Sequence, residues 1–567
     1  MVASERGSGV RSGAGEPSGP SSGGRVRSWW PPSGGGFSSR WSSERAGGRL
    51  WGGLRAHRWF LGVLGLGVAL RVVTMLGYRP VLWFPDSYTY VVTALRPRPD
   101  LVRPAGYSMF LRLLEPFHSF GFVAFVQHLL GAAIGVLVYA AVRRAGGRVW
   151  AATLAAAPVL LDAYQVQLEH LLVSDTLFAF LLVAAMYVLL GRPRWRAVCL
   201  AGALLGAATL TRTVGLPLLA VVAVWLLVRR PSREPLVRRP RKQTSGADAA
   251  GAVWPPVGRP GEQAPAAGRA VGARGVMTRA WRRAWRRARP AAVLVLVALV
   301  PIAGYAAWFW ATYHRVGIVG SNGVFLYGRT MSFADCSVMR PPRDLAVLCD
   351  DRPPSRRPPS QEYVWAPDAP LVALPGITFT QETDRLAGRF ALLALRSQPL
   401  DYAASVLSEL ARSFTPNRPV YPDQEIYDYY EFPARTPPPP GRYPATYGAS
   451  LAVRYERGPI GTRVVEPLAG WTRAYQDVVW LPGTALLAVL LLPPGVAAGR
   501  AWRSRARRRA EGPGASRTAW APPWVMAVSL LVIPAATAEF DYRYVLPAVP
   551  LAFLSAGLLT ARQTDRS

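Results

Sequence analysis

The chain alternates long apolar segments with connections that carry most of its charge. The candidate membrane spans are 58–77, 121–142, 149–166, 171–190, 197–211, 213–229, 291–311, 476–497, 520–538 and 545–561. A transmembrane helix needs about 20 mostly apolar residues, and in lipid a helix satisfies its own backbone hydrogen bonds. The sequence therefore predicts an all-α polytopic membrane protein with about ten transmembrane helices and a large mixed extracytoplasmic loop domain. Two pairs, 149–166 with 171–190 and 197–211 with 213–229, are short and closely joined, so short spans and re-entrant hairpins both remain open.

Arginine placement orients these segments. The connections after 142, 190, 229 and 497 are rich in arginine, and the chain ends with Arg562 and Arg566. Such connections stay in the cytoplasm under the positive-inside rule. The alternate connections, 78–120, 167–170, 212, 312–475 and 539–544, are then outside, and both termini are cytoplasmic. The prediction is a multi-pass protein of the plasma membrane.

The net charge of +33 raises a second explanation, since strongly basic soluble proteins often bind nucleic acid. Here the charge lies between apolar runs and in two low-complexity stretches, which argues against a nucleic-acid partner and for membrane lipids. Arginine supplies nearly all of it, and Lys242 is the only lysine. Together with abundant alanine, glycine and proline, this composition indicates a bacterial source.

Seven regions follow from this pattern. They are a disordered cytoplasmic tail (1–56), an N-terminal transmembrane catalytic module (57–229), a basic, partly disordered cytoplasmic loop (230–290), a further span (291–311), an extracytoplasmic domain (312–475), C-terminal spans (476–561) and a cytoplasmic tail (562–567). Within the extracytoplasmic domain, residues 384–414 have helical periodicity that Pro399 interrupts.

Three cysteines are too few for a disulfide framework. Cys336 and Cys349 both fall in the predicted outer domain, where thiols can be oxidised, and a bridged and a free pair remain equally open. We predict no metal site on cysteine, because no histidine or cysteine partner follows at ligand spacing.

Asp86 follows the first apolar segment and lies at the predicted outer boundary. Pro85 and Ser87 favour a turn there, so Asp86 either caps a short helix from Ser87 or acts as a general base, and the two roles are compatible. Arg103, on the same side, is either a phosphate ligand or an interfacial anchor. Charged groups gathered on one side of a bundle indicate binding or chemistry there.

Three further charged positions fall on that side. Asp175 opens an apolar segment, where it is either a helix cap or a functional acid, with Glu169 and His170 as alternatives. Arg212 lies between two spans, where binding an anionic headgroup and pairing with Asp175 or Asp86 are both open. Arg543 precedes the last span and either pairs with Asp541 or binds phosphate.

No nucleotide-binding, zinc-peptidase or nucleophile-elbow motif occurs at a suitable place. Chemistry on the outer face has no access to cytoplasmic ATP or nucleotide sugars. A donor used there has to come through the membrane, and a lipid-linked phosphate meets that requirement.

The chain resembles the GT-C superfamily of membrane glycosyltransferases, which includes protein O-mannosyltransferases and lipid A aminoarabinose transferases. The resemblance rests on the order of short motifs: Phe84-Pro85-Asp86-Ser87-Tyr88, Arg103-Pro104-Ala105-Gly106-Tyr107, Ser174 to Phe178, Arg212, Leu326-Tyr327-Gly328-Arg329 with Cys336, and Arg543 and Tyr544 followed by Pro547. It covers most of 58–230 and 520–561. It implies a polyprenyl-phosphate sugar donor and an inverting transfer.

Carried over residue by residue, the resemblance makes Asp86 the catalytic base and Arg212 and Arg543 ligands of the donor phosphate. Many members have a second acid where this chain has Ser87. Asp175 either supplies that acid or the site is altered. Use of a divalent metal varies across the superfamily and stays open here, and no other cofactor is implied.

We therefore expect a glycosyltransferase that moves a sugar from a polyprenyl-phosphate donor to an extracytoplasmic glycan, lipid or protein. A lipid or glycan transporter is the first alternative, but it would carry polar residues through the depth of its spans. A non-catalytic scaffold for cell-envelope assembly is the second. It predicts that Asp86 is dispensable while 312–475 is not.

Overall fold

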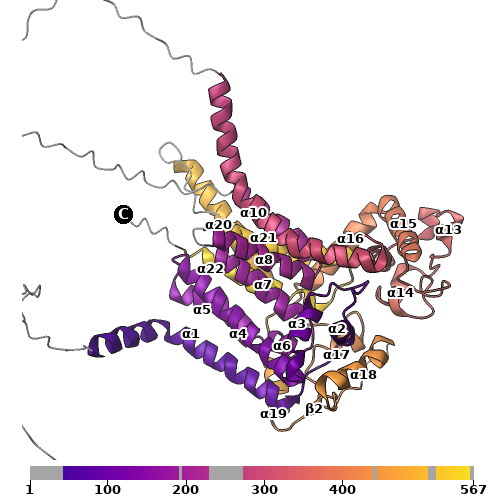
Figure 1. Ribbon diagram of the computed structural model, residues 1–567, viewed down its shortest axis with the longest axis horizontal. Coiled ribbons are helices and arrows are strands. Elements are labelled where there is room, and N and C mark those ends of the chain that lie inside the picture. The colour runs from indigo at the N-terminus through magenta and orange to yellow at the C-terminus, as the bar shows by residue number, and fades with distance from the viewer. Residues whose placement is uncertain (1–42, 191–193, 229–272, 439–442, 508–518, 562–567) are drawn as a thin grey trace, which may run out of the picture. The chain divides into compact units, whose positions relative to one another are not determined.

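The computed structural model describes residues 43–190, 194–228, 273–438, 443–507 and 519–561 (Figure 1). The predictions for most of the two tails and for the middle of the loop 230–290 lie outside these residues. The chain divides into two units, Met1–Arg55 and Ala56–Ser567. In the first unit the described residues, from Ser43 onward, are helical. Helix α1 continues from the first unit into the second, and all the other described helices and strands belong to the second unit.

Each apolar segment is helical. The helices are α1 (Ser43–Gly77), α4 (Phe120–Arg144), α5 (Val149–Leu161), α6 (Ala163–His170), α7 (Asp175–Leu189), α8 (Trp195–Thr211), α9 (Gly215–Val228), α10 (Ala273–Tyr313), α20 (Gly483–Arg507), α21 (Ala521–Thr537) and α22 (Ala548–Leu558). The predicted all-α polytopic fold is confirmed. Among the described residues, four helices, α1, α4, α10 and α20, are long and apolar enough to cross a membrane alone, and α5 with α6 makes a fifth candidate. Helices α7, α8, α9 and α21 are shorter but also apolar.

Several boundaries differ from the sequence expectation. Helix α1 begins inside the predicted tail and α10 inside the predicted loop, since alanine and arginine are strong helix formers. Segment 149–166 is not one helix, because α5 and α6 meet at a bend of 50°. Asp162 caps α6 there by accepting from the Tyr164 amide at 3.0 Å. The span expected from 476 begins at Gly483, since Leu468–Val478 forms a separate helix, α19.

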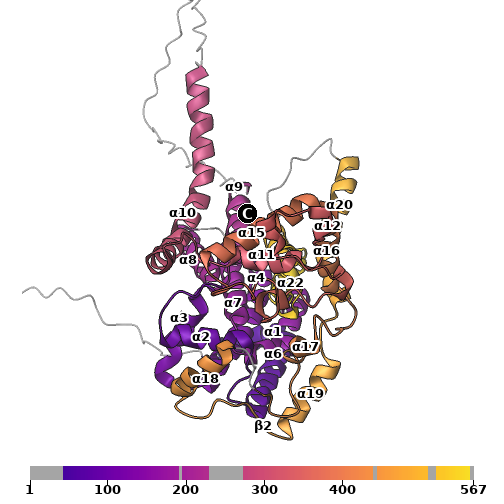
Figure 2. The ribbon, with the colours of Figure 1, turned by 90° about the vertical axis from the view of Figure 1, so that its right-hand side faces the viewer.

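The apolar helices pack side by side (Figures 1 and 2). Helix α8 lies against α7 and α10, α4 against α5 and α7, and α22 against α5 and α21. Two glycines on α8 allow it to approach α10 closely. A Cβ on Gly202 would lie 2.6 Å from the Leu294 carbonyl oxygen, and one on Gly206 would lie 2.7 Å from that of Ala298. Glycines spaced by four residues let backbones approach in this way in membranes.

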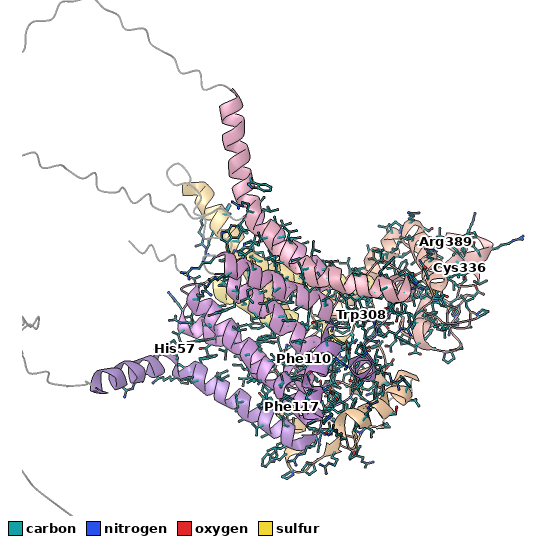
Figure 3. All side chains as sticks on the ribbon, viewed as in Figure 1. His57, Phe110, Phe117, Trp308, Cys336 and Arg389 are labelled. Atoms are coloured by element: carbon teal, nitrogen blue, oxygen red, sulfur yellow. A yellow bond between two sulfur atoms is a disulfide. The ribbon has the colours of Figure 1, made fainter. Side chains whose placement is uncertain are left out.

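The predicted outer connections fold into short helices. They are α2 (Pro85–Leu95), α3 (Gly106–Leu114), α11 (Asn322–Thr330), α12 (Cys336–Met339), α13 (Arg343–Ala346), α14 (Glu362–Trp365), α15 (Gln381–Ser397), α16 (Pro399–Arg412), α17 (Gln424–Asp428), α18 (Tyr443–Glu456) and α19, with 3-10 turns at Glu115–Phe117, Pro354–Arg356 and Tyr542–Tyr544. The periodic stretch 384–414 is helical on both sides of Pro399, as the sequence predicts. Cys336 and Cys349 are joined by a disulfide in this region, where Figure 3 labels Cys336.

Two backbone pairings hold the segment that precedes Asp86. Strand β1 (Tyr78–Arg79) pairs antiparallel with β2 (Arg463–Val464), in the register Tyr78 opposite Val464. Leu82 then forms a parallel bridge with Leu171, just before α7. Helix α18 packs against α2 from the other side. The chain is thereby fixed at the point where the candidate site begins.

Candidate functional site

Asp86 lies in the first turn of α2. The helix begins at Pro85, whose fixed φ and missing N–H suit a first helical position, and Phe84 is the N-cap residue. The alternative in which Asp86 caps a helix from Ser87 is therefore wrong. Ser87 serves the backbone instead: its Oγ accepts from the Phe84 amide at 3.0 Å and donates to the Leu172 carbonyl at 2.7 Å. The carboxylate of Asp86 is left free for other partners.

Two arginines hold that carboxylate from different parts of the chain. Arg103 Nη2 donates to Asp86 Oδ1 at 2.5 Å, and Arg543 Nη1 donates to Asp86 Oδ2 at 2.9 Å. Burial alone would raise the pKa of Asp86, but the two guanidinium groups outweigh it and hold the pKa well below its usual range. Asp86 is therefore ionised at any physiological pH.

Arg543 is itself fixed by its surroundings. Its Nε lies 3.0 Å from Asp541 Oδ2, so it bridges two carboxylates. The Tyr430 hydroxyl donates to Asp541 Oδ1 at 2.5 Å. The guanidinium carbon lies 4.5 Å from the centre of the Phe84 ring, an arrangement that favours a cation. The expected pairing of Arg543 with Asp541 and its position at the Asp86 site are both present.

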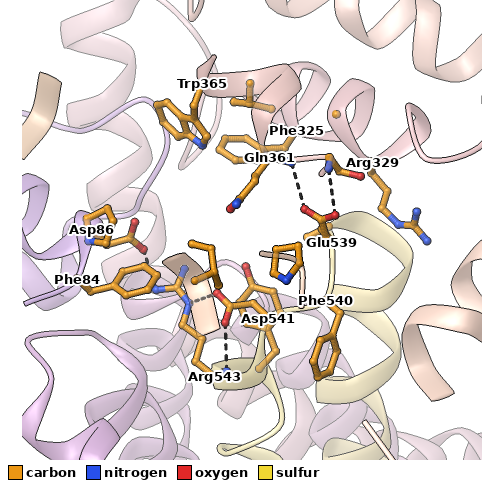
Figure 4. Close-up of a pocket in the computed structure, with 18 of the residues that line it drawn as sticks. Phe84, Asp86, Phe325, Arg329, Gln361, Trp365, Glu539, Phe540, Asp541 and Arg543 are labelled. Atoms are coloured by element: carbon orange, nitrogen blue, oxygen red, sulfur yellow. Dashed lines mark hydrogen bonds and ion pairs between the residues drawn. The ribbon is translucent and has the colours of Figure 1, made fainter. Parts of the chain in front are cut away.

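These groups line a pocket of about 1080 Å³, counting the part open to solvent. Asp86, Arg103, Asp541 and Arg543 form one side, as Figure 4 shows for the three that it labels. The other side comes from the predicted outer domain and from the end of α21. Its members are Phe325, Gly328, Arg329, Ser360, Gln361, Val364, Trp365, Pro422, Ile426, Glu539 and Phe540. The pocket is thus closed between the helix bundle and the 312–475 region.

Glu539 is a pocket residue that the sequence reasoning did not select. Its carboxylate accepts from the Ser360 amide at 3.0 Å and from the Gln361 amide at 3.2 Å. Burial raises its pKa to about 7, although the two amides act in the opposite direction. Its sequence position offered one signal: an acid two residues before Asp541, in a short outer connection.

Asp175 and Arg212 lie beside the pocket, not in its lining. They form an ion pair with each other, so of the choices left open for Arg212 the structure shows pairing with Asp175. The Tyr544 ring lies close to two arginines, with its centre 5.2 Å from the guanidinium carbon of Arg212 and 5.6 Å from that of Arg543. Tyr544 itself lines the pocket. This pair therefore reaches the site through an aromatic ring.

Glu169 and His170, the alternatives to Asp175, belong to a different cluster inside the helix bundle. Arg71 donates to Glu169 from Nε at 2.7 Å and from Nη2 at 2.6 Å. His128 connects them, since its Nδ1 lies 2.9 Å from Glu169 and its Nε2 lies 3.0 Å from His170. None of these residues lines the pocket. They are a structural network, not part of the candidate site.

Within the described residues, no group of three histidine, cysteine, aspartate or glutamate side chains is placed to hold a metal ion. At the pocket, the carboxylates meet arginines and backbone amides. The site as built is suited to an anionic ligand beside a carboxylate.

Comparison with known proteins adds one family. Residues 110–237 match the profile of dolichyl-phosphate-mannose-protein mannosyltransferase. This match, over part of the chain, supports the likeness to membrane glycosyltransferases of the GT-C superfamily that the sequence motifs indicate. The matched residues run from α3 to beyond α9 and include Asp175 and Arg212, whereas Asp86, Arg103 and Arg543 lie outside them.

A solved structure shows a weaker likeness. The Saccharomyces cerevisiae protein O-mannosyltransferase Pmt1–Pmt2 complex bound to the sugar donor is similar at 14% identity with a TM-score of 0.31. The match covers 51% of this chain and 36% of that chain. A search of curated proteins found no match.

Proposed function

We propose that this glycosyltransferase moves a sugar from a polyprenyl phosphate to an acceptor hydroxyl at the pocket. The observation that carries the proposal is the meeting of Asp86, Arg103 and Arg543 in one pocket, at the face where the outer connections gather. A carboxylate beside two guanidinium groups provides a base and a phosphate site together.

The donor class follows from charge and access. The matched family takes its name from a sugar carried on dolichyl phosphate, which is a lipid-linked phosphate. Planar guanidinium groups bind phosphate oxygens through paired hydrogen bonds, and Arg103 and Arg543 are positioned to do so. A phosphate that engages them also draws them from Asp86. The carboxylate then becomes a stronger base at the moment when the donor is in place.

In the transfer step, one bond to the sugar forms as another breaks. The acceptor oxygen forms a bond to the anomeric carbon while the bond from that carbon to the phosphate oxygen breaks. The phosphate keeps the electron pair, and the acceptor proton passes to Asp86. Positive charge develops on the sugar in the transition state and negative charge on the leaving phosphate. Asp86 stabilises the first charge and the two arginines stabilise the second.

Asp175 and Arg212 receive a positioning role in this proposal. Arg212 of this ion pair contacts the Tyr544 ring, which also contacts Arg543. A direct phosphate contact by Arg212 fits less well, because Arg212 does not line the pocket. We further propose that the enzyme lies in a bacterial plasma membrane with both termini in the cytoplasm, which places the pocket outside.

The test is sugar transfer in membranes from a panel of radiolabelled polyprenyl-phosphate sugars. Asp86→Asn keeps the shape of the side chain and should lower the rate by about 10²–10⁴-fold, the usual contribution of a general base. The matched control is Asp344→Asn, which makes the same change at an exposed ion pair with Arg389 (labelled in Figure 3). Full transfer by folded Asp86→Asn would exclude the base role. No transfer from any donor by the folded wild type would exclude the donor class.

A further inference from the structure

The two sides of the pocket differ in charge. On one side, Asp86 and Asp541 are both paired with arginine. On the other, Glu539 has no ion-pair partner within the part of the chain that the structure describes, and it accepts from two backbone amides and from the Tyr421 hydroxyl. This asymmetry indicates that the two sides receive different parts of the substrates.

Arg329 lines the pocket on the Glu539 side, but its Nε and Nη1 donate to other groups. Its Nε donates to the Ala535 carbonyl at 3.1 Å, and its Nη1 donates to Ser332 and Ser405, each at 2.7 Å. These three acceptors do not line the pocket. Figure 4 shows the Arg329 guanidinium turned away from the middle of the pocket. Its Nη2 has no hydrogen-bond partner but is buried, so a phosphate in the pocket would reach it only if the Arg329 side chain moved.

The other groups that line that side include two aromatic rings and a side-chain amide. The rings of Phe325 and Trp365 lie edge to face at 6.3 Å, and both are half-buried. Figure 4 shows the Gln361 side chain pointing into the pocket between them and Glu539. Flat apolar faces next to a carboxylate and an amide complement a molecule that has hydroxyl groups on its edge and C–H groups on its face. A sugar ring has both.

We propose that the Glu539 side of the pocket binds the acceptor, and that the acceptor is an uncharged carbohydrate. This inference rests on the proposed glycosyl transfer and names its second substrate. Glu539 accepts a hydrogen bond from a hydroxyl of the acceptor sugar while Phe325 and Trp365 contact its C–H face. An anionic acceptor would be repelled by ionised Glu539, and the Arg329 guanidinium on this side is turned away from the middle of the pocket.

The raised pKa of Glu539 agrees with this assignment and predicts a measurable pH dependence of acceptor binding. Burial, together with the charge of nearby Glu409, raises its pKa to about 7, although the amides of Ser360 and Gln361 and the charge of Arg329 act in the opposite direction. The Tyr421 hydroxyl also lies 3.5 Å from its Oε1. The ionised form accepts hydroxyl donors more strongly. Acceptor binding should therefore weaken as the pH falls through about 7.

The experiment measures initial rates of transfer to octyl α-mannoside and to a serine- and threonine-containing peptide, using full-length enzyme in nanodiscs. Glu539→Gln should raise the KM for octyl mannoside about 10-fold or more, because a charged hydrogen-bond acceptor is lost. The KM for the donor should stay unchanged, and the pH dependence of the acceptor KM near 7 should disappear. Trp365→Ala, which makes no contact with the Glu539 carboxylate, should also raise the acceptor KM.

Two controls match these changes on the surface. Glu466→Gln alters an exposed acid paired with Arg473, and Trp471→Ala alters an exposed tryptophan of α19. Neither should change any kinetic constant.

Three outcomes would overturn the proposal. One is transfer to the peptide but not to the glycoside. Another is a change of the donor KM, not the acceptor KM, in both pocket variants. The third is an acceptor KM that Glu539→Gln leaves unaltered. Release of sugar from the donor to water distinguishes failure of this proposal from failure of the proposed function. If the wild type neither releases nor transfers the sugar, the transfer itself is excluded. If the wild type releases the sugar but does not transfer it to octyl mannoside, only the carbohydrate acceptor is excluded.

Discussion

Two buried arginine–carboxylate clusters of the described residues differ in their surroundings: that of Arg71 lies inside the helix bundle and that of Asp86 lies at the pocket. In the bundle, Arg71 and Glu169 are 3% and 2% exposed, and both carboxylate oxygens accept from the same guanidinium. Arg71 also donates to the carbonyls of Gly67 and Leu160. At the pocket, Asp86 shares two arginines, and the Arg103 side chain is 20% exposed. The two clusters have the same kinds of charged group, but those of the first contact only other buried protein groups, whereas those of the second line a pocket.

This difference separates a structural from a functional use of charge. An ion pair buried among apolar helices is costly unless its hydrogen bonds are satisfied, and removal of one partner leaves an uncompensated charge. The pocket cluster has solvent and substrate within reach, so loss of one arginine leaves Asp86 with another. We therefore expect substitutions in the bundle to change stability and substitutions at the pocket to change catalysis.

The largest expected effect is on stability, from Arg71→Met. Methionine fills a similar volume but leaves Glu169 buried without its arginine, and such changes cost about 3–5 kcal/mol. Thermal unfolding of the purified enzyme in detergent, followed by tryptophan fluorescence, should show a large fall in Tm. The control, Arg79→Met, removes an exposed arginine that donates to the Leu76 carbonyl and should change little. Equal Tm values for the two variants would show that the bundle cluster is not structural.

The fold was largely predictable because membrane-spanning helices carry a strong local signal. Apolar length and arginine placement located each apolar helix, and Pro399 marked the junction of α15 and α16. Tertiary context decided what local pattern could not. The break at Asp162 and the start of α20 at Gly483 depend on how these ends meet the predicted outer region, where the Gly483 amide donates to the Thr415 carbonyl at 3.0 Å.

The candidate site was predictable in part for the same reason. Asp86, Arg103 and Arg543 stood out as charges at one membrane boundary, and the fold brings them together although Asp86 and Arg543 are 457 positions apart. Glu539 was missed because its function depends on what packs over it, namely Ser360 and Gln361. Arg71 was missed despite a usable signal, since an arginine inside an apolar segment is costly and usually has a partner.

A smaller effect, on donor binding, should follow from Arg103→Gln. One charge-assisted contact to the donor phosphate is lost, which corresponds to about 1.5–3 kcal/mol and so to a donor KM raised by about 10–150-fold. Asp86 keeps its contact with Arg543, so the Tm should stay close to that of the wild type. Donor titration and thermal unfolding of the same preparation check both parts. A fall in Tm as large as that of Arg71→Met would remove the distinction between the two clusters.

The smallest effect comes from adding one methyl group next to the bundle cluster. A Cβ at Gly131 would lie 1.9 Å from Glu169 Oε1, so Gly131→Ala must displace the carboxylate from Arg71. Overpacking of this kind costs about 1–3 kcal/mol. Gly65→Ala is the matched control in α1, because a Cβ there meets nothing within 4 Å and alanine favours the helix by up to about 1 kcal/mol. Thermal unfolding should therefore show opposite shifts for the two substitutions, with transfer per folded molecule unchanged in both. If Gly131→Ala instead lowers transfer while leaving the Tm intact, the bundle cluster communicates with the pocket, and the separation of structural from functional charge is too simple.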